Sequence, residues 1–208
     1  DMIQRAERPM IVASTGVFYD KAWDALLRVA ERNDIAVTES APMRGHFSDS
    51  HALSASTGLD AVRSADLVIL VGQYCMPSIG EFAFGPDAKW IRIDPDATDI
   101  GRNVPIDLGI VSSEKAALEA LEDALPKRSR PEWRNELAAA RKAFDDQSDE
   151  YYSLGLKYST DTESIHPAVI GKHLQDFLYN GDIAPDQTTV VSGGYGIGRY
   201  TRRYLRAH

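Results

Sequence analysis

Apolar and polar positions follow two different patterns along the first 125 residues of the chain. Short, mainly apolar runs, which are typical of buried strands, lie at 10–13, 35–38, 66–72, 89–93 and 107–111. Between them, apolar side chains recur at helical spacing over 19–32, 58–64 and 114–125. The run 66–72 is apolar on both faces, as expected of a central parallel strand. The alternation predicts an α/β fold with a doubly wound, Rossmann-like parallel sheet.

The pattern changes after residue 125. The segment 126–131 is charged and bounded by prolines, 132–150 has the periodicity of a long polar helix, and 151–162 shows no regular pattern. Beyond it, a helix is expected from Ser164 or His166, with Pro167 near its first turn. A strand over 188–192 and a helix over 197–207 follow. We therefore predict three parts: a sheet domain over 1–125, a linker with a helix over 126–165, and the start of a second α/β domain over 166–208.

Charge and composition exclude several classes of function. The formal net charge is −8, which argues against a nucleic-acid partner because phosphate binding needs a basic surface. No stretch approaches the roughly 18 apolar residues of a membrane helix, so no membrane association is expected. The single cysteine, Cys75, cannot form an internal disulfide, which favours a reducing, cytoplasmic location.

Candidate ligand-binding residues lie at the carboxyl ends of the predicted strands, where open α/β sheets bind their ligands. Gly16 lies between a strand and a helix, so its backbone could approach a phosphate. Asp94 ends the strand 89–93 and could accept hydrogen bonds from ribose hydroxyl groups. Alternatively, Gly16 forms only a tight turn and Asp94 caps the turn before Pro95. The spacing G-x-G-x-x-G of dinucleotide-binding loops is absent.

A second glycine loop follows the predicted strand 188–192. Gly193 and Gly194 precede Tyr195 and a helix, and this arrangement is typical of a diphosphate cradle or of an ordinary turn. His46 and His51 share a polar loop, but no cluster of cysteines or carboxylates with metal-ligand spacing accompanies them. We therefore assign no metal ligand and no catalytic residue within this chain.

The order of these motifs resembles the central domain of acetolactate-synthase-like thiamine-diphosphate enzymes. The similarity runs through Gly16-Val17, the strand 66–72, and Trp90-Ile91-Arg92-Ile93-Asp94-Pro95 with the following Ile100-Gly101-Arg102-Asn103. The tail, from His166-Pro167 to Ser192-Gly193-Gly194, is similar to the start of the domain that holds the cofactor's diphosphate. Family members carry aspartate where this chain has Ser192.

The resemblance implies a lyase or carboligase that uses thiamine diphosphate and Mg²⁺ in its full-length form. Its substrate would be a 2-keto acid or, as in the oxalyl-CoA decarboxylase and 2-hydroxyacyl-CoA lyase branch, an acyl-CoA. FAD or ADP could bind the central domain near Gly16, Asp94 and Ile110, and Gly193, Gly194 and Tyr195 would lie at the diphosphate. The full-length enzyme would be a homodimer or homotetramer. The family's activating glutamate and metal motif are not found here, so this chain alone would be catalytically incomplete.

Two alternatives stay open. The sheet domain could be a stand-alone nucleotide-binding module for FAD, ADP or NAD. It could also be a structural spacer that supports neighbouring domains, which is compatible with the family resemblance.

Overall fold

The computed structural model describes residues 1–40, 44–72, 84–102, 105–181, 183–184, 187–191, 193 and 195–207. The chain forms two compact units, Asp1–Arg141 and Lys142–His208. Within the described residues, no helix is long and apolar enough to span a membrane.

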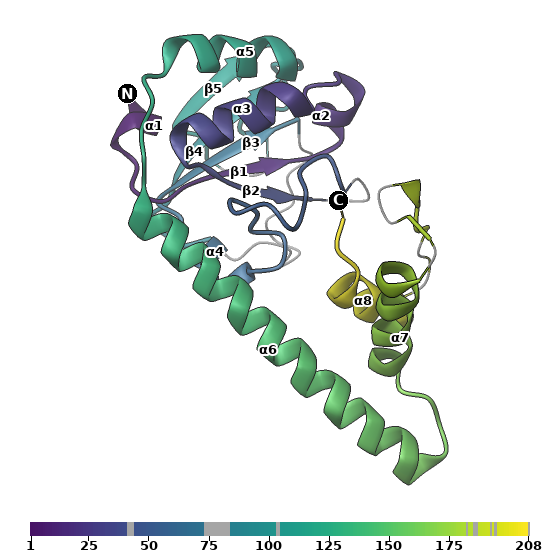
Figure 1. Ribbon diagram of the computed structural model, residues 1–208. Helices are drawn as coiled ribbons and strands as arrows, with labels where there is room; N and C mark the ends of the chain where they lie inside the picture. Colours follow the sequence, from purple (N-terminus) through teal and green to yellow (C-terminus); the bar gives the residue numbers. More distant parts are fainter. Residues whose placement is uncertain are drawn as a thin grey trace. The chain divides into compact units, whose positions relative to one another are not determined.

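The first unit is built on a five-stranded sheet with the order β2-β1-β3-β4-β5 (Figure 1). Every neighbouring pair in this sheet is parallel. The strands are β1 (Pro9–Ala13), β2 (Ala36–Glu39), β3 (Leu67–Val71), β4 (Lys89–Asp94) and β5 (Leu108–Val111). All residues of β1, β2 and β3 are buried, whereas β5 is an exposed edge strand. The predicted α/β fold with a parallel sheet is confirmed.

Helices complete the unit. They are α1 (Met2–Arg5), α2 (Thr15–Tyr19), α3 (Trp23–Asn33), α4 (Leu59–Arg63), α5 (Glu114–Ala124) and the first turns of α6 (Pro131–Thr162). Figure 1 shows α3 and α5 side by side over one face of the sheet, with α4 and α6 on the other. Because both faces are covered, the central strands can be wholly apolar.

The helix expected over 19–32 is interrupted. α2 ends at Tyr19 and α3 begins at Trp23, with Lys21 between them at a φ of 52°. A residue in the left-handed region cannot continue a right-handed helix, so the chain turns there. Ala22 is fully buried at this turn.

The first unit continues past residue 125. The indole of Trp133 is buried, and its Nε1 donates to the main-chain oxygen of Pro9 at 3.0 Å. The buried guanidinium of Arg130 donates to main-chain oxygens of Ile3, Ala6 and Asn33. These contacts anchor the start of the segment predicted to be a linker with a helix, and the first compact unit extends to Arg141.

The second unit contains the remainder of α6, α7 (Pro167–Asn180) and α8 (Tyr195–Tyr204). His166 caps α7, its Nδ1 accepting from the Ala168 amide at 3.2 Å, with Pro167 in the first turn as predicted. The expectation of irregular structure over 151–162 is wrong, because α6 continues to Thr162. Residues 188–191 do not form the expected strand, and Ser192 lies outside the described residues. An extended segment becomes a strand only with a hydrogen-bonded partner, and the described residues of this unit contain no other strand.

Candidate functional site at the carboxyl edge of the sheet

The sheet reverses its direction of winding between β1 and β3. The chain leaves β1 for β2 on one side, whereas β3 is followed by β4 on the other. Ligands of open α/β sheets bind outside the carboxyl ends of strands at such a switch point. Gly16 follows β1 and Gly72 follows β3, so both glycines lie at this switch point.

Gly16 and Gly72 are packed against each other. The Gly16 amide donates to the Gly72 carbonyl at 3.0 Å. A Cβ on Gly16 would lie 2.5 Å from the Cα of Gly72 and 2.2 Å from Oε1 of Glu114. Gly72 also has a φ of +59°, which favours glycine. Packing alone therefore requires glycine at both positions, and ligand contact at Gly16 stays a prediction.

Glu114, the first residue of α5, is the third member of this contact. It is only 5% exposed, and burial raises the pKa of its carboxyl, with the charges of Asp20 and Asp94 raising it further. Asp20 accepts from the Lys115 amide at 2.6 Å, and Ser113 caps α5. The carboxyl edge is thus acidic at this point, and two of the first free amides of α5 already have acceptors. An anionic diphosphate placed over Gly16 would meet negative charge.

Asp94 is buried at the end of β4. Its Oδ2 accepts from Nη2 of the buried Arg92 at 2.8 Å, and its Oδ1 accepts from the Asp96 amide at 3.0 Å. The turn-capping interpretation of Asp94 is therefore realised. A carboxylate keeps further lone pairs, so a ribose contact stays a prediction. Ile110 of β5 pairs with Ile93, which places it beside Asp94.

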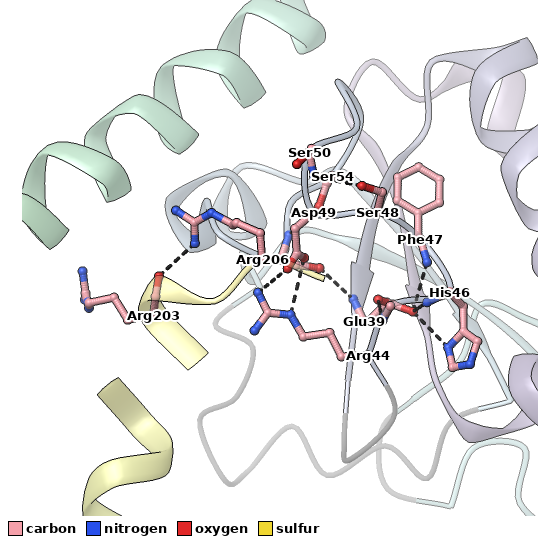
Figure 2. Close-up of polar contacts among 12 residues, drawn as sticks. Glu39, Arg44, His46, Phe47, Ser48, Asp49, Ser50, Ser54, Arg203 and Arg206 are labelled. Atoms are coloured by element: carbon pink, nitrogen blue, oxygen red, sulfur yellow. Dashed lines mark hydrogen bonds and ion pairs between the residues drawn. The ribbon is translucent and has the colours of Figure 1, made fainter. Parts of the chain in front are cut away.

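Glu39, at the end of β2, organises the loop that follows that strand (Figure 2). Its carboxylate accepts from the amides of Gly45 at 2.7 Å, His46 at 3.0 Å and Phe47 at 3.3 Å. The Nδ1 of His46 lies 3.2 Å from the same carboxylate. Burial raises the pKa of Glu39, and the hydrogen bonds from Gly45 and His46 partly oppose this. Glu39 therefore fixes the backbone of Gly45, His46 and Phe47 beside the carboxyl end of β2.

The two histidines of that loop do not converge. His51 places Nε2 3.2 Å from Glu31, whereas His46 faces Glu39. Within the described ranges, no group of three or more His, Cys, Asp or Glu could hold a metal ion.

The second glycine loop belongs to the other unit. Gly193 is exposed, and no described atom lies within 4 Å of the position that a Cβ would take there. Tyr195 begins α8, and Gly194 lies outside the described residues. An exposed Gly193 with open space beside it does not by itself fit a magnesium diphosphate.

The structure thus brings three of the predicted site residues to one edge of the sheet, namely Gly16, Asp94 and Ile110. The sequence interpretation missed Gly72, Glu114 and Glu39. Each stands at the end of a predicted strand or the start of the following helix, which is the signal that could have identified them.

Comparison with known proteins identifies the family to which the sheet domain is similar. Residues 1–121 match the family described as thiamine pyrophosphate enzyme, central domain. The acetolactate synthase of Mycobacterium leprae is 28% identical over 220 residues, covering 94% of this chain. The probable acetolactate synthase large subunit of Methanocaldococcus jannaschii is 34% identical over 134 residues, covering 60%. The oxalyl-CoA decarboxylase of Escherichia coli is 27% identical over 123 residues, covering 58%.

These matches cover only part of each relative. The matched segments make up 35% of the Mycobacterium leprae protein, 23% of the Methanocaldococcus jannaschii protein and 22% of the Escherichia coli protein. The chain therefore spans about a third or less of the length of these relatives.

Proposed function

This chain belongs to the thiamine pyrophosphate enzyme family, and from this premise we propose that it serves a thiamine-diphosphate- and Mg²⁺-dependent lyase or carboligase as its central domain and the start of its cofactor domain. The enzyme would make or break a C–C bond of a 2-keto acid or a 2-hydroxyacyl-CoA-type substrate. The observation that carries the proposal is the family match over residues 1–121, which is the segment that folds into the parallel sheet. The cofactor itself would supply the stabilised carbanion.

We further propose that this chain contributes scaffold and orientation rather than reacting groups. The carboxyl edge of the sheet is closed by the Gly16–Gly72 contact and made acidic by Glu114. This supports a central domain without a diphosphate over Gly16, although the predicted FAD or ADP could still approach Asp94 and Ile110 from outside. The family match favours this assignment over a stand-alone nucleotide-binding module. The single cysteine supports the proposed cytoplasmic location.

The test uses a full-length enzyme that carries this segment, beside the 208-residue chain. Thiamine diphosphate is titrated into each protein by calorimetry with Mg²⁺ present. Turnover is then measured with pyruvate as a 2-keto acid and with oxalyl-CoA as an acyl-CoA. We expect the full-length enzyme to bind the cofactor and to turn over one substrate class, and the 208-residue chain to show no turnover.

Two further outcomes decide the remaining points. A full-length protein that binds no thiamine diphosphate with Mg²⁺ present would overturn the proposal. A thermal-shift series with FAD, ADP, NAD and CoA on the 208-residue chain separates the nucleotide-module alternative, which needs a clear shift from one of them. A shift that is lost on Asp94→Ala would assign that ligand to the sheet edge.

A further inference from the structure

The carboxyl group of Glu114 is a buried acid without a partner of opposite charge. Glu114 begins α5 and is 5% exposed. In the described part of the chain, no other residue donates a hydrogen bond to its carboxylate or forms an ion pair with it. Buried carboxylates are normally paired or hydrogen-bonded, because removing their charge from water is costly. An unpaired acid at the ligand-binding edge of an α/β sheet is therefore a candidate functional residue.

This carboxyl group occupies the space beside both glycines of the switch point. A Cβ added to Gly16 would lie 2.2 Å from Oε1 of Glu114, and a Cβ added to Gly72 would lie 2.6 Å from the same atom. In a phosphate-binding turn this space must be free, because the phosphate approaches the glycine backbone directly. Glu114 therefore covers the backbone that a diphosphate would need to reach.

The other charged groups around Glu114 reinforce the negative potential. The charges of Asp20, after α2, and Asp94, at the end of β4, both raise the pKa of the Glu114 carboxyl. The cation on β4, Arg92, is buried and pairs with Asp94 at 2.8 Å. Lys115, next in α5, is exposed. A phosphate brought to this edge would thus approach one unpaired carboxylate and a second, Asp20, that is bound only through a main-chain amide.

The N-terminus of α5 offers little to an anion. Free amides at the start of a helix normally attract phosphate. Here Asp20 accepts from the Lys115 amide at 2.6 Å, and Oγ of Ser113 accepts from the Ala116 amide at 3.3 Å. The chain's own oxygens therefore take the place that phosphate oxygens would have.

We propose that Glu114 is a specificity-determining residue that turns anionic nucleotides away from the switch point of the sheet. Its carboxylate repels phosphate groups, and its side chain covers the two glycines. This inference rests on the proposed role of the unit as a central domain and names the residue that decides whether the domain takes a nucleotide. Removal of this one carboxylate should then allow a diphosphate to bind at the edge.

The test is the binding of ADP to the 208-residue chain, measured by isothermal titration calorimetry. The unmodified chain should bind ADP with a Kd in the millimolar range or weaker. Glu114→Gln keeps the size of the side chain but removes the charge, and it should tighten ADP binding by at least about tenfold. Glu114→Ser also opens the space beside Gly16 and should tighten it further.

Two controls isolate the effect. Glu122→Gln removes one negative charge from the same helix, but Glu122 pairs with Arg28 at 2.8 Å and should leave ADP binding unchanged. Adenosine lacks phosphates, so it should bind no more tightly to the Glu114 variants than to the unmodified chain. Tryptophan fluorescence confirms that the unit Asp1–Arg141 is folded in each variant, since all three tryptophans lie within it.

A pH series separates repulsion from a merely structural role. The pKa of Glu114 is raised by burial and by the charges of Asp20 and Asp94, so its carboxylate becomes neutral as the pH falls through that value. The ratio of the Kd of the unmodified chain to that of Glu114→Gln should be about tenfold or more above neutral pH and should fall toward one on acidification. Titration of ADP itself cancels in this ratio.

Four results would overturn the proposal. They are micromolar ADP binding by the unmodified chain, Glu114 variants that bind ADP no more tightly than Glu122→Gln, an equal gain for adenosine, and a Kd ratio that does not change with pH. Failure of the proposed function would be seen separately, because it is tested with thiamine diphosphate on the full-length enzyme and not with ADP on this chain.

Discussion

The contact between Gly16 and Gly72 allows a substitution whose cost can be worked out from distances. In Gly16→Ala, the new Cβ would lie 2.2 Å from Oε1 of Glu114 and 2.5 Å from the Cα of Gly72, where ordinary contact begins near 3.4 Å. The glutamate side chain can rotate away, but the backbone of Gly72 is fixed by the sheet. Overpacking of this kind costs roughly 1–3 kcal/mol, and the backbone overlap places this case at about 3 kcal/mol.

Unfolding of the first unit can be followed by itself. All three tryptophans of the chain, at positions 23, 90 and 133, lie within Asp1–Arg141. Tryptophan fluorescence during thermal or urea unfolding therefore reports on that unit. A loss of about 3 kcal/mol corresponds to a melting temperature lowered by roughly 6–12 °C.

Two other glycines separate overlap from backbone strain. Gly101 has a φ of +77° but nothing within 4 Å of a Cβ, so Gly101→Ala should cost only the roughly 1–2 kcal/mol of a left-handed residue. In Gly72→Ala, a φ of +59° is combined with a Cβ that would lie only 2.5 Å from the Cα of Gly16, so this should be the most destabilising of the three. The reasoning is refuted if Gly16→Ala costs no more than Gly101→Ala.

Three further substitutions test the charges and caps. Glu114→Gln should raise the melting temperature at pH 7 but not near pH 4. Because the pKa of Glu114 is raised in the folded protein, ionisation of its carboxyl lowers the stability as the pH rises through that pKa. Curves of melting temperature against pH that run parallel for the two proteins would contradict this prediction. Arg130→Ala should cost roughly 3–5 kcal/mol by urea unfolding, because three main-chain carbonyls lose a buried donor, whereas the more exposed Arg128→Ala should cost about 0–1 kcal/mol. His166→Ala removes the cap of α7 and should lower the stability of the second unit by about 1 kcal/mol, seen by circular dichroism with no change in the tryptophan transition.

The strands are the most predictable part of the fold. The apolar pattern predicts a strand over 66–72 and β3 spans Leu67–Val71, because a strand buried on both faces must be apolar at every position. The failures lie where local pattern is weak. In α6 beyond Glu150, Gly155 and several Ser and Thr residues have low helix propensity, so the pattern there does not predict a helix. Residues 188–191 are apolar enough for a strand but have no partner in the described part of their unit.

The candidate site is only partly predictable. Gly16 and Asp94 can be identified because glycines and carboxylates after strands mark the carboxyl edge. What they do there depends on residues far away in the sequence. Glu114 lies nearly a hundred positions from Gly16, and nothing in either local pattern indicates that they touch.

The sequence by itself therefore determined the α/β class, the run of strands and the family resemblance, because these depend on which side chains are apolar and in what order. Only the tertiary structure decided that the sheet edge at Gly16 is closed and acidic, and that residues 126–141 belong to the first compact unit. Each of these results is a long-range contact, or the lack of one, and its free energy comes from groups that meet only after the chain has folded.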